Sequence, residues 1–151
     1  MTAKIDFDAL LQEKCTFRVV SINHLADLQR EIESRTEHGQ FDSEFAQQYM
    51  FRFKFTPTEE LKNAKSIIVV AMSRPLTKAI FSWNGKKHAF TLPPTYTAYD
   101  EKRIYVERLV ADAVGRKGYK VTTSNLPLKL LAARSGLAEY GRNNIAYVQD
   151  G

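Results

Sequence analysis

The sequence predicts a mixed domain of the α/β or α+β class, in which helices flank a central sheet and one β-hairpin protrudes. Three stretches carry this prediction: an apolar run at Ser66 to Ser73, two strand-like segments around Asn84 and Gly85, and a long helical pattern from Tyr99 to Val114. Helices and strands alternate without an internal repeat, which favours a layered domain over a solenoid or a bundle. The 151 residues are enough for one domain, so residues 1–151 are expected to form a single unit.

The amino-terminal third predicts a helix, a strand and two further helices. Ile5 to Glu13 has helical spacing, and Phe17 to Ile22 is compact and β-branched, as strands are. Asn23 is expected to cap a helix that runs toward Gly39. Asp42 is expected to begin a second helical stretch, which carries several aromatic residues that suit core packing or the wall of a flat pocket. These aromatics are Phe45, Tyr49, Phe51, Phe53 and Phe55.

The middle of the chain contains the clearest strand. Pro57 to Glu60 predicts a helical turn, and Ser66 to Ser73 is apolar at successive positions, which is typical of a strand in the middle of a sheet covered on both faces. Ala79 to Trp83 and Lys86 to Leu92 flank Asn84-Gly85, a strong hairpin signal because both residues tolerate positive φ.

The last third predicts one long helix and three shorter elements. Tyr99 to Val114 has apolar residues at helical spacing and should be the longest helix, followed by a strand at Tyr119 to Thr123. A short helix is expected in the stretch from Leu126 to Gly136, and Asn144 to Val148 predicts a final strand.

Charge, hydropathy and cysteine content limit the kinds of function that the chain can have. Twenty-two Lys and Arg against seventeen Asp and Glu give a net charge of +5, but no long run of like charge forms a basic arm. No segment has the length of a signal peptide core or a membrane span, so a cytoplasmic protein with no membrane partner is expected. The single cysteine, Cys15, cannot hold an iron–sulfur cluster and is expected to be a small buried hydrophobe.

Residues suited to ligand binding are densest between Leu126 and Asn144. Pro127 suits the start of a helix, and Gly136 suits the left-handed residue that ends one. Gly141 repeats this signal. The expected product is a tight turn that presents Arg134, Arg142, Asn143, Asn144 and free backbone N–H groups. Such a turn suits a polar or anionic ligand, although most glycine turns are only helix stops.

This stretch resembles the signature of the epoxyqueuosine reductases, which is matched by Ala133, Arg134, Gly136, Leu137, Gly141, Arg142 and Asn143. The sequence from Glu139 to Asn143 is also similar to a segment of the corrinoid-dependent reductive dehalogenases. The resemblance implies a nitroreductase-like domain that binds cobalamin. In both groups it is followed by a ferredoxin-like domain with [4Fe-4S] clusters, which would here belong to a missing domain or a partner protein.

The resemblance assigns a cofactor site to the signature turn. The implied cofactor-binding residues are Arg134, Ser135, Gly136, Tyr140, Gly141, Arg142, Asn143 and Asn144. An apolar wall for the corrin ring is expected from Tyr96, Tyr99 and the aromatics between Phe45 and Phe55. Two alternatives stay open: an FMN-binding domain of the same fold, and a binding module without catalytic activity.

The sequence departs from the family where a proton donor is expected. An aspartate precedes the signature in epoxyqueuosine reductases, and Thr122 stands at that position here. A threonine hydroxyl is too weak an acid to replace it. Tyr96 and Tyr99 are therefore the catalytic candidates, whereas Asp100 is interpreted as a helix-start charge. The expected substrate is a small molecule or a modified nucleoside other than epoxyqueuosine; tRNA is a weaker candidate partner.

Overall fold

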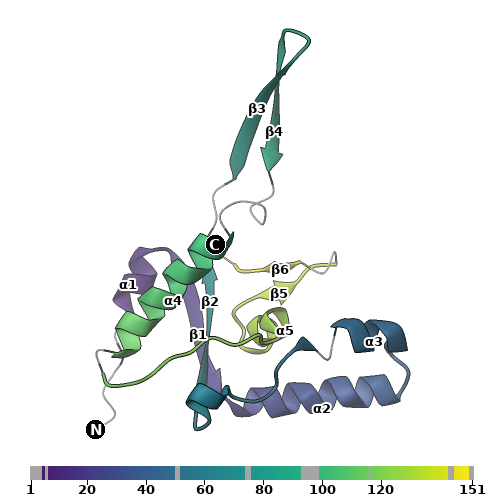
Figure 1. Ribbon diagram of the computed structural model, residues 1–151, viewed down its shortest axis with the longest axis vertical. Helices are drawn as coiled ribbons and strands as arrows, with labels where there is room; N and C mark the ends of the chain where they lie inside the picture. Colours follow the sequence, from purple (N-terminus) through teal and green to yellow (C-terminus); the bar gives the residue numbers. More distant parts are fainter. Residues whose placement is uncertain are drawn as a thin grey trace.

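The computed structural model describes residues 5, 7–49, 52–73, 76–92, 99–115, 117–142 and 145–149. These residues form a mixed α+β structure of helices and two-stranded antiparallel sheets (Figure 1). The elements in chain order are α1 (Asp8–Gln12), β1 (Cys15–Ser21), α2 (Asn23–Glu37), α3 (Ser43–Tyr49), η2 (Glu59–Leu61), β2 (Ser66–Met72), β3 (Thr77–Trp83), β4 (Lys86–Leu92), α4 (Tyr99–Gly115), α5 (Leu128–Arg134), β5 (Glu139–Tyr140) and β6 (Ala146–Tyr147).

A ribbon of β1 and β2 lies at the centre of the fold, with helices on both faces (Figure 1). Ile67 and Val69 point to one face and pack in a cluster with residues of α2 and α5, including Leu28 and Leu131. The alternate residues of β2 point to the other face. They join a second cluster of Leu10, Cys15, Val110 and Val114, which brings together α1, β1 and α4. Cys15 is buried there, as predicted, and burial raises the pKa of its thiol.

The central sheet predicted from the sequence is absent from the described residues, where β2 pairs only with β1. The apolar run of β2 was interpreted correctly as covered on both faces, but the inference that the strand lies in the middle of a sheet was wrong. A strand that is covered by helices on both faces needs apolar residues at successive positions, whether it belongs to a two-stranded ribbon or to a larger sheet. The apolar run therefore indicates that both faces of β2 are covered, but it does not indicate how many strands lie beside β2.

The predicted helices are present with changed ends. The first spans only Asp8–Gln12. The cap residue of α2 is Ile22, and the Ser21 hydroxyl accepts a hydrogen bond from the Asn23 N–H at 3.2 Å, so the predicted capping by Asn23 is wrong. Asp42 does accept a hydrogen bond from the Phe45 N–H at 2.9 Å, as a helix-start residue should. The helix that follows ends at Tyr49. Phe53 and Phe55 therefore lie in the segment after α3.

The predicted hairpin is confirmed in detail. The strands β3 and β4 pair from Thr77 with Leu92 to Trp83 with Lys86. Asn84 and Gly85 connect them with φ of 48° and 73°, as a tight hairpin turn requires. Figure 1 shows this ribbon projecting away from the packed elements.

The carboxy-terminal region is less regular than predicted. The expected strand at residues 119–123 has no strand assignment, whereas α5 forms inside the predicted helical stretch. The predicted final strand is reduced to Ala146–Tyr147, which pairs antiparallel with Glu139–Tyr140. Strands β5 and β6 both lie against α5.

Candidate functional site

The signature segment folds as a helix stop followed by a small hairpin. Gly136 has φ of 67°, so its left-handed conformation is confirmed. The Gly136 N–H donates to the Ala133 carbonyl at 3.1 Å, and the Leu137 N–H donates to the Ala132 carbonyl at 2.9 Å. These two bonds form a Schellman motif. Leu131 and Leu137 lie in the same buried cluster and complete its hydrophobic contact. Gly141 is not among the described residues with positive φ, so the second left-handed position predicted there is wrong.

Arg134 is engaged with another helix. Its guanidinium makes a hydrogen-bonded ion pair with the Glu31 carboxylate on α2. The same carboxylate pairs with Arg35 at 2.8 Å. The hydrogen bond from Arg134 is the main reason that the pKa of Glu31 lies below its ordinary value. Arg134 therefore joins α5 to α2 and is not the unpaired cation that the sequence led us to expect, and its predicted role in cofactor binding stays a prediction.

Other polar groups of the turn also bond internally. The Ser135 hydroxyl donates to the Ala132 carbonyl at 3.0 Å. The Ala138 N–H donates to the same carbonyl at 3.1 Å, and the Gly141 N–H donates to the Ile145 carbonyl at 2.8 Å. The prediction of free backbone N–H groups is wrong for Gly136, Leu137, Ala138 and Gly141. These four N–H groups are therefore used within the turn.

Two signature side chains remain accessible near this turn. Arg142 is exposed, at the connection between β5 and β6. Tyr140 is 42% exposed, and partial burial raises the pKa of its phenol. Tyr140 therefore keeps its proton near neutral pH and can donate a hydrogen bond, while Arg142 supplies a positive charge.

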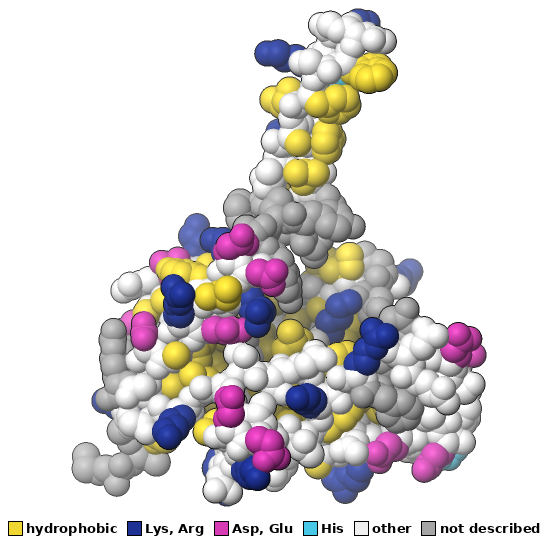
Figure 2. All heavy atoms as spheres, in the orientation of Figure 1, with side chains coloured by type: hydrophobic (Ala, Val, Ile, Leu, Met, Phe, Trp, Pro, Cys, Tyr) yellow, Lys and Arg dark blue, Asp and Glu magenta, His cyan; other side chains and the backbone are white. Residues whose placement is uncertain are grey.

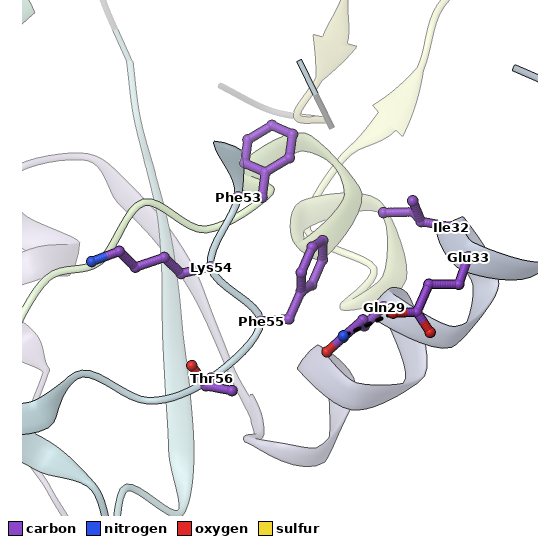
Figure 3. A pocket seen from close by; sticks show the side chains of 7 residues that line it. All are labelled: Gln29, Ile32, Glu33, Phe53, Lys54, Phe55 and Thr56. Carbon is purple, nitrogen blue, oxygen red and sulfur yellow. Dashed lines mark hydrogen bonds between the residues drawn. The ribbon is translucent and has the colours of Figure 1, made fainter. Parts of the chain in front are cut away.

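An open groove of about 310 Å³ lies between α2 and the segment that follows α3. Figure 3 shows Phe53 and Phe55 on one side, with Gln29, Ile32 and Glu33 on α2 opposite. Phe55 also packs against the cluster that contains Leu131 and Leu137, so the groove and the signature helix stop share part of one core. Phe53 and Phe55 thus line this groove, whereas Phe45 lies on α3 and is exposed. Their predicted role as the wall of a cofactor site stays a prediction.

Hydrogen bonds hold the groove segment against the start of the signature region. The Lys54 N–H donates to the Asn125 carbonyl at 3.0 Å. The Asn125 side chain in turn donates to the Arg52 carbonyl at 3.1 Å. Neither this pairing nor the pairing of Arg134 with Glu31 had a signal in the sequence, because the partners are distant along the chain.

Four of the predicted site residues have side chains outside the described part of the structure. Tyr96, Asn143 and Asn144 lie outside the described residues, and Tyr99 begins α4 but its side chain is not described. The roles predicted for these four residues therefore stay predictions. Thr122, at the position of the family's aspartate, donates its hydroxyl to the Glu60 carboxylate at 3.1 Å.

Comparison of the chain with models of known protein families found no match, and comparisons with curated proteins and with solved structures found none either. In the part of the chain that the structure describes, no helix has the length and apolar character needed to cross a bilayer. The same residues contain no group of three or more His, Cys, Asp or Glu side chains that would suit a metal ion.

Proposed function

We propose that this chain is the amino-terminal, cobalamin-binding part of an iron–sulfur oxidoreductase similar to the epoxyqueuosine reductases, with the nitroreductase-like fold of that family. The observation that carries the proposal is the signature segment itself. Its glycine at position 136 occupies a left-handed helix stop, and its basic residue at position 142 is exposed beyond that stop. Any helix stop accounts for the glycine, and the exposed cation beyond it is what suits an anionic group of a ligand.

Two separate features of the described residues suit parts of a large cofactor: the groove beside α2, and the turn between β5 and β6, whose side chains are not among the residues that line that groove. Phe53 and Phe55 offer a flat aromatic surface, and Tyr140 and Arg142 offer hydrogen-bond donors for amide and phosphate groups. The groove volume of about 310 Å³ lies at the lower end of the usual range for ligand pockets. A corrin ring would therefore lie against this wall, and the iron–sulfur domain or a partner would supply the opposite wall.

Each part of the chain has a separate task in this proposal. The pair of Arg134 with Glu31 fixes α5 against α2 and so fixes the turn that carries Arg142. The bound cobalamin would supply a reducible cobalt, with electrons from the iron–sulfur clusters. Tyr96 or Tyr99 would donate the proton to a substrate other than epoxyqueuosine, because Thr122 cannot do so.

The experiment is a titration of the chain with cobalamin under anaerobic conditions, followed by visible spectra and equilibrium dialysis. Arg142→Ala should weaken binding by about tenfold to a hundredfold, the usual effect of losing a charged hydrogen-bond donor. Arg108→Ala is the matched control, since Arg108 is an exposed arginine on α4. Equal effects of the two substitutions would show that the turn is not part of the cobalamin site. Saturable binding of FMN but not of cobalamin would favour the flavin alternative.

A further inference from the structure

The β3–β4 hairpin exposes more large apolar surface than a solvated ribbon needs. Ile80 is 67% exposed and Trp83 is 66% exposed, and Leu76, directly before β3, is 72% exposed. Figure 2 shows hydrophobic side chains along the projecting ribbon, with basic side chains at its tip. None of the hairpin's residues belongs to either of the two buried clusters described above. Their apolar surface therefore does not serve the core of this chain.

Both faces of the hairpin carry apolar groups. On one face Phe81 stacks on His88, with ring centroids 5.3 Å apart, and meets Phe90 edge-on at 5.6 Å. Trp83 shares this face, because strand residues two positions apart point the same way. Ile80 points to the opposite face. The stacking orders the aromatic side chains and still leaves Phe81 and Phe90 close to half exposed.

The charge of the hairpin identifies the chemistry of a partner. Between Leu76 and Leu92 the chain has Lys78, Lys86, Lys87 and His88 but no Asp or Glu. A second copy of the same hairpin would bring like charges together, which is unfavourable. The complementary partner is therefore an anionic surface that also accepts apolar side chains.

We propose that the β3–β4 hairpin binds the interface of bilayers that contain anionic phospholipids. Tryptophan and lysine are the side chains that favour the boundary between headgroups and acyl chains. Basic residues are attracted to anionic headgroups, and the exposed Phe, Ile and Leu side chains gain by leaving water. The hairpin lies in the interface and does not cross the bilayer, because the unpaired backbone groups at the edges of a two-stranded ribbon need water. This proposal departs from the sequence expectation of no membrane partner. That expectation rested on the lack of a spanning segment, and peripheral binding needs none.

The shape and composition favour lipid over nucleic acid. Proteins that bind single strands combine a positively charged groove with aromatic platforms. The hairpin is instead a narrow projecting ribbon (Figure 2). Ile80 and Leu76 cannot stack on bases, yet they are among its most exposed side chains. Readout of a duplex groove relies most often on Arg or Lys pairs to guanine and on Asn or Gln pairs to adenine. The strands β3 and β4 contain lysines but no Arg, Asn or Gln, and lysines serve an anionic headgroup equally well.

The chain contains a single tryptophan, Trp83, so its fluorescence reports directly on the hairpin. Vesicles of phosphatidylcholine with phosphatidylglycerol should shift the Trp83 emission to the blue, and lipids brominated in their acyl chains should quench it. Vesicles of pure phosphatidylcholine should bind at least tenfold more weakly, and added salt should weaken binding to the anionic vesicles.

Substitutions separate the charge and apolar contributions while keeping the fluorophore. The double variant Lys86→Glu and Lys87→Glu should lose at least tenfold in vesicle affinity. The matched control, Lys117→Glu with Lys120→Glu, makes the same change of net charge at exposed residues outside the hairpin and should bind as the wild type does. Ile80→Thr keeps a β-branched residue in the strand and should weaken vesicle binding severalfold without altering the far-UV circular dichroism.

Three results would overturn the proposal. The first is the absence of a blue shift with anionic vesicles, and the second is an equal loss of binding in the control variant. The third is quenching of Trp83 by single-stranded oligouridylate together with no binding to vesicles, which would identify a nucleic-acid partner instead.

Discussion

Replacing Gly136 tests whether the signature turn depends on a left-handed residue. Gly136 has φ of 67°, and a Cβ built on it meets no atom within 4 Å. The cost of a side chain is therefore backbone strain without a steric clash. An L-residue in this conformation costs about 1–2 kcal/mol, asparagine tolerates it better, and a β-branched residue tolerates it worst. We expect stability to fall in the order Gly136→Asn, Gly136→Ala, Gly136→Val.

Gly115 provides the internal control. It ends α4 without positive φ, and a Cβ there also meets no atom within 4 Å. Gly115→Ala should therefore raise the free energy of unfolding by up to about 1 kcal/mol, while Gly136→Ala lowers it by about 1–2 kcal/mol. Urea denaturation measures both values, and thermal melts should show a shift of about 2–4 °C per kcal/mol. If the two alanine variants shift stability in the same direction by the same amount, the strain argument is wrong.

Two further predictions concern the ion pair and the reaction. Glu31→Gln should destabilise the protein at pH 7 by at most about 1 kcal/mol, since both partners of the pair with Arg134 keep about a third of their surface exposed. The pKa of Glu31 is lowered on folding, so its contribution is present above the ordinary glutamate pKa and is lost as the pH falls through the lowered value. In urea denaturation, the difference in free energy of unfolding between the wild type and Glu31→Gln should therefore shrink from pH 7 to pH 3. A difference that stays constant over this range would show that the charge of Glu31 is not its cause. In anaerobic assays with reduced cobalamin and an electron donor, we expect no efficient conversion of epoxyqueuosine in tRNA, because Thr122 cannot act as the acid. Robust queuosine formation, unaffected by Tyr96→Phe and Tyr99→Phe, would refute both the substrate prediction and the proposed proton donors.

The sequence determined the features that depend on neighbouring residues. Asn84-Gly85 specified the hairpin because both residues accept positive φ, and they adopt it in the structure. Gly136 specified the end of α5 for the same reason. The apolar run in β2 specified cover on both faces, and helices lie on both faces. Each of these outcomes is decided by local backbone freedom or by side-chain alternation, which can be read directly from the chain.

Only the tertiary structure decided which partners these elements have. A strand exists through its hydrogen-bonded neighbours, so the apolar run of β2 could not reveal that β1 is its partner in a two-stranded ribbon. Residues 119–123 were also predicted to form a strand, yet no strand forms there, and Thr122 bonds to the Glu60 side chain. Arg134 was expected to be an unpaired cation, but folding places it against Glu31, a residue far away in the sequence. The local pattern therefore decides what a residue is able to do, whereas the folded chain decides whether its charges and hydrogen bonds are already used within the protein.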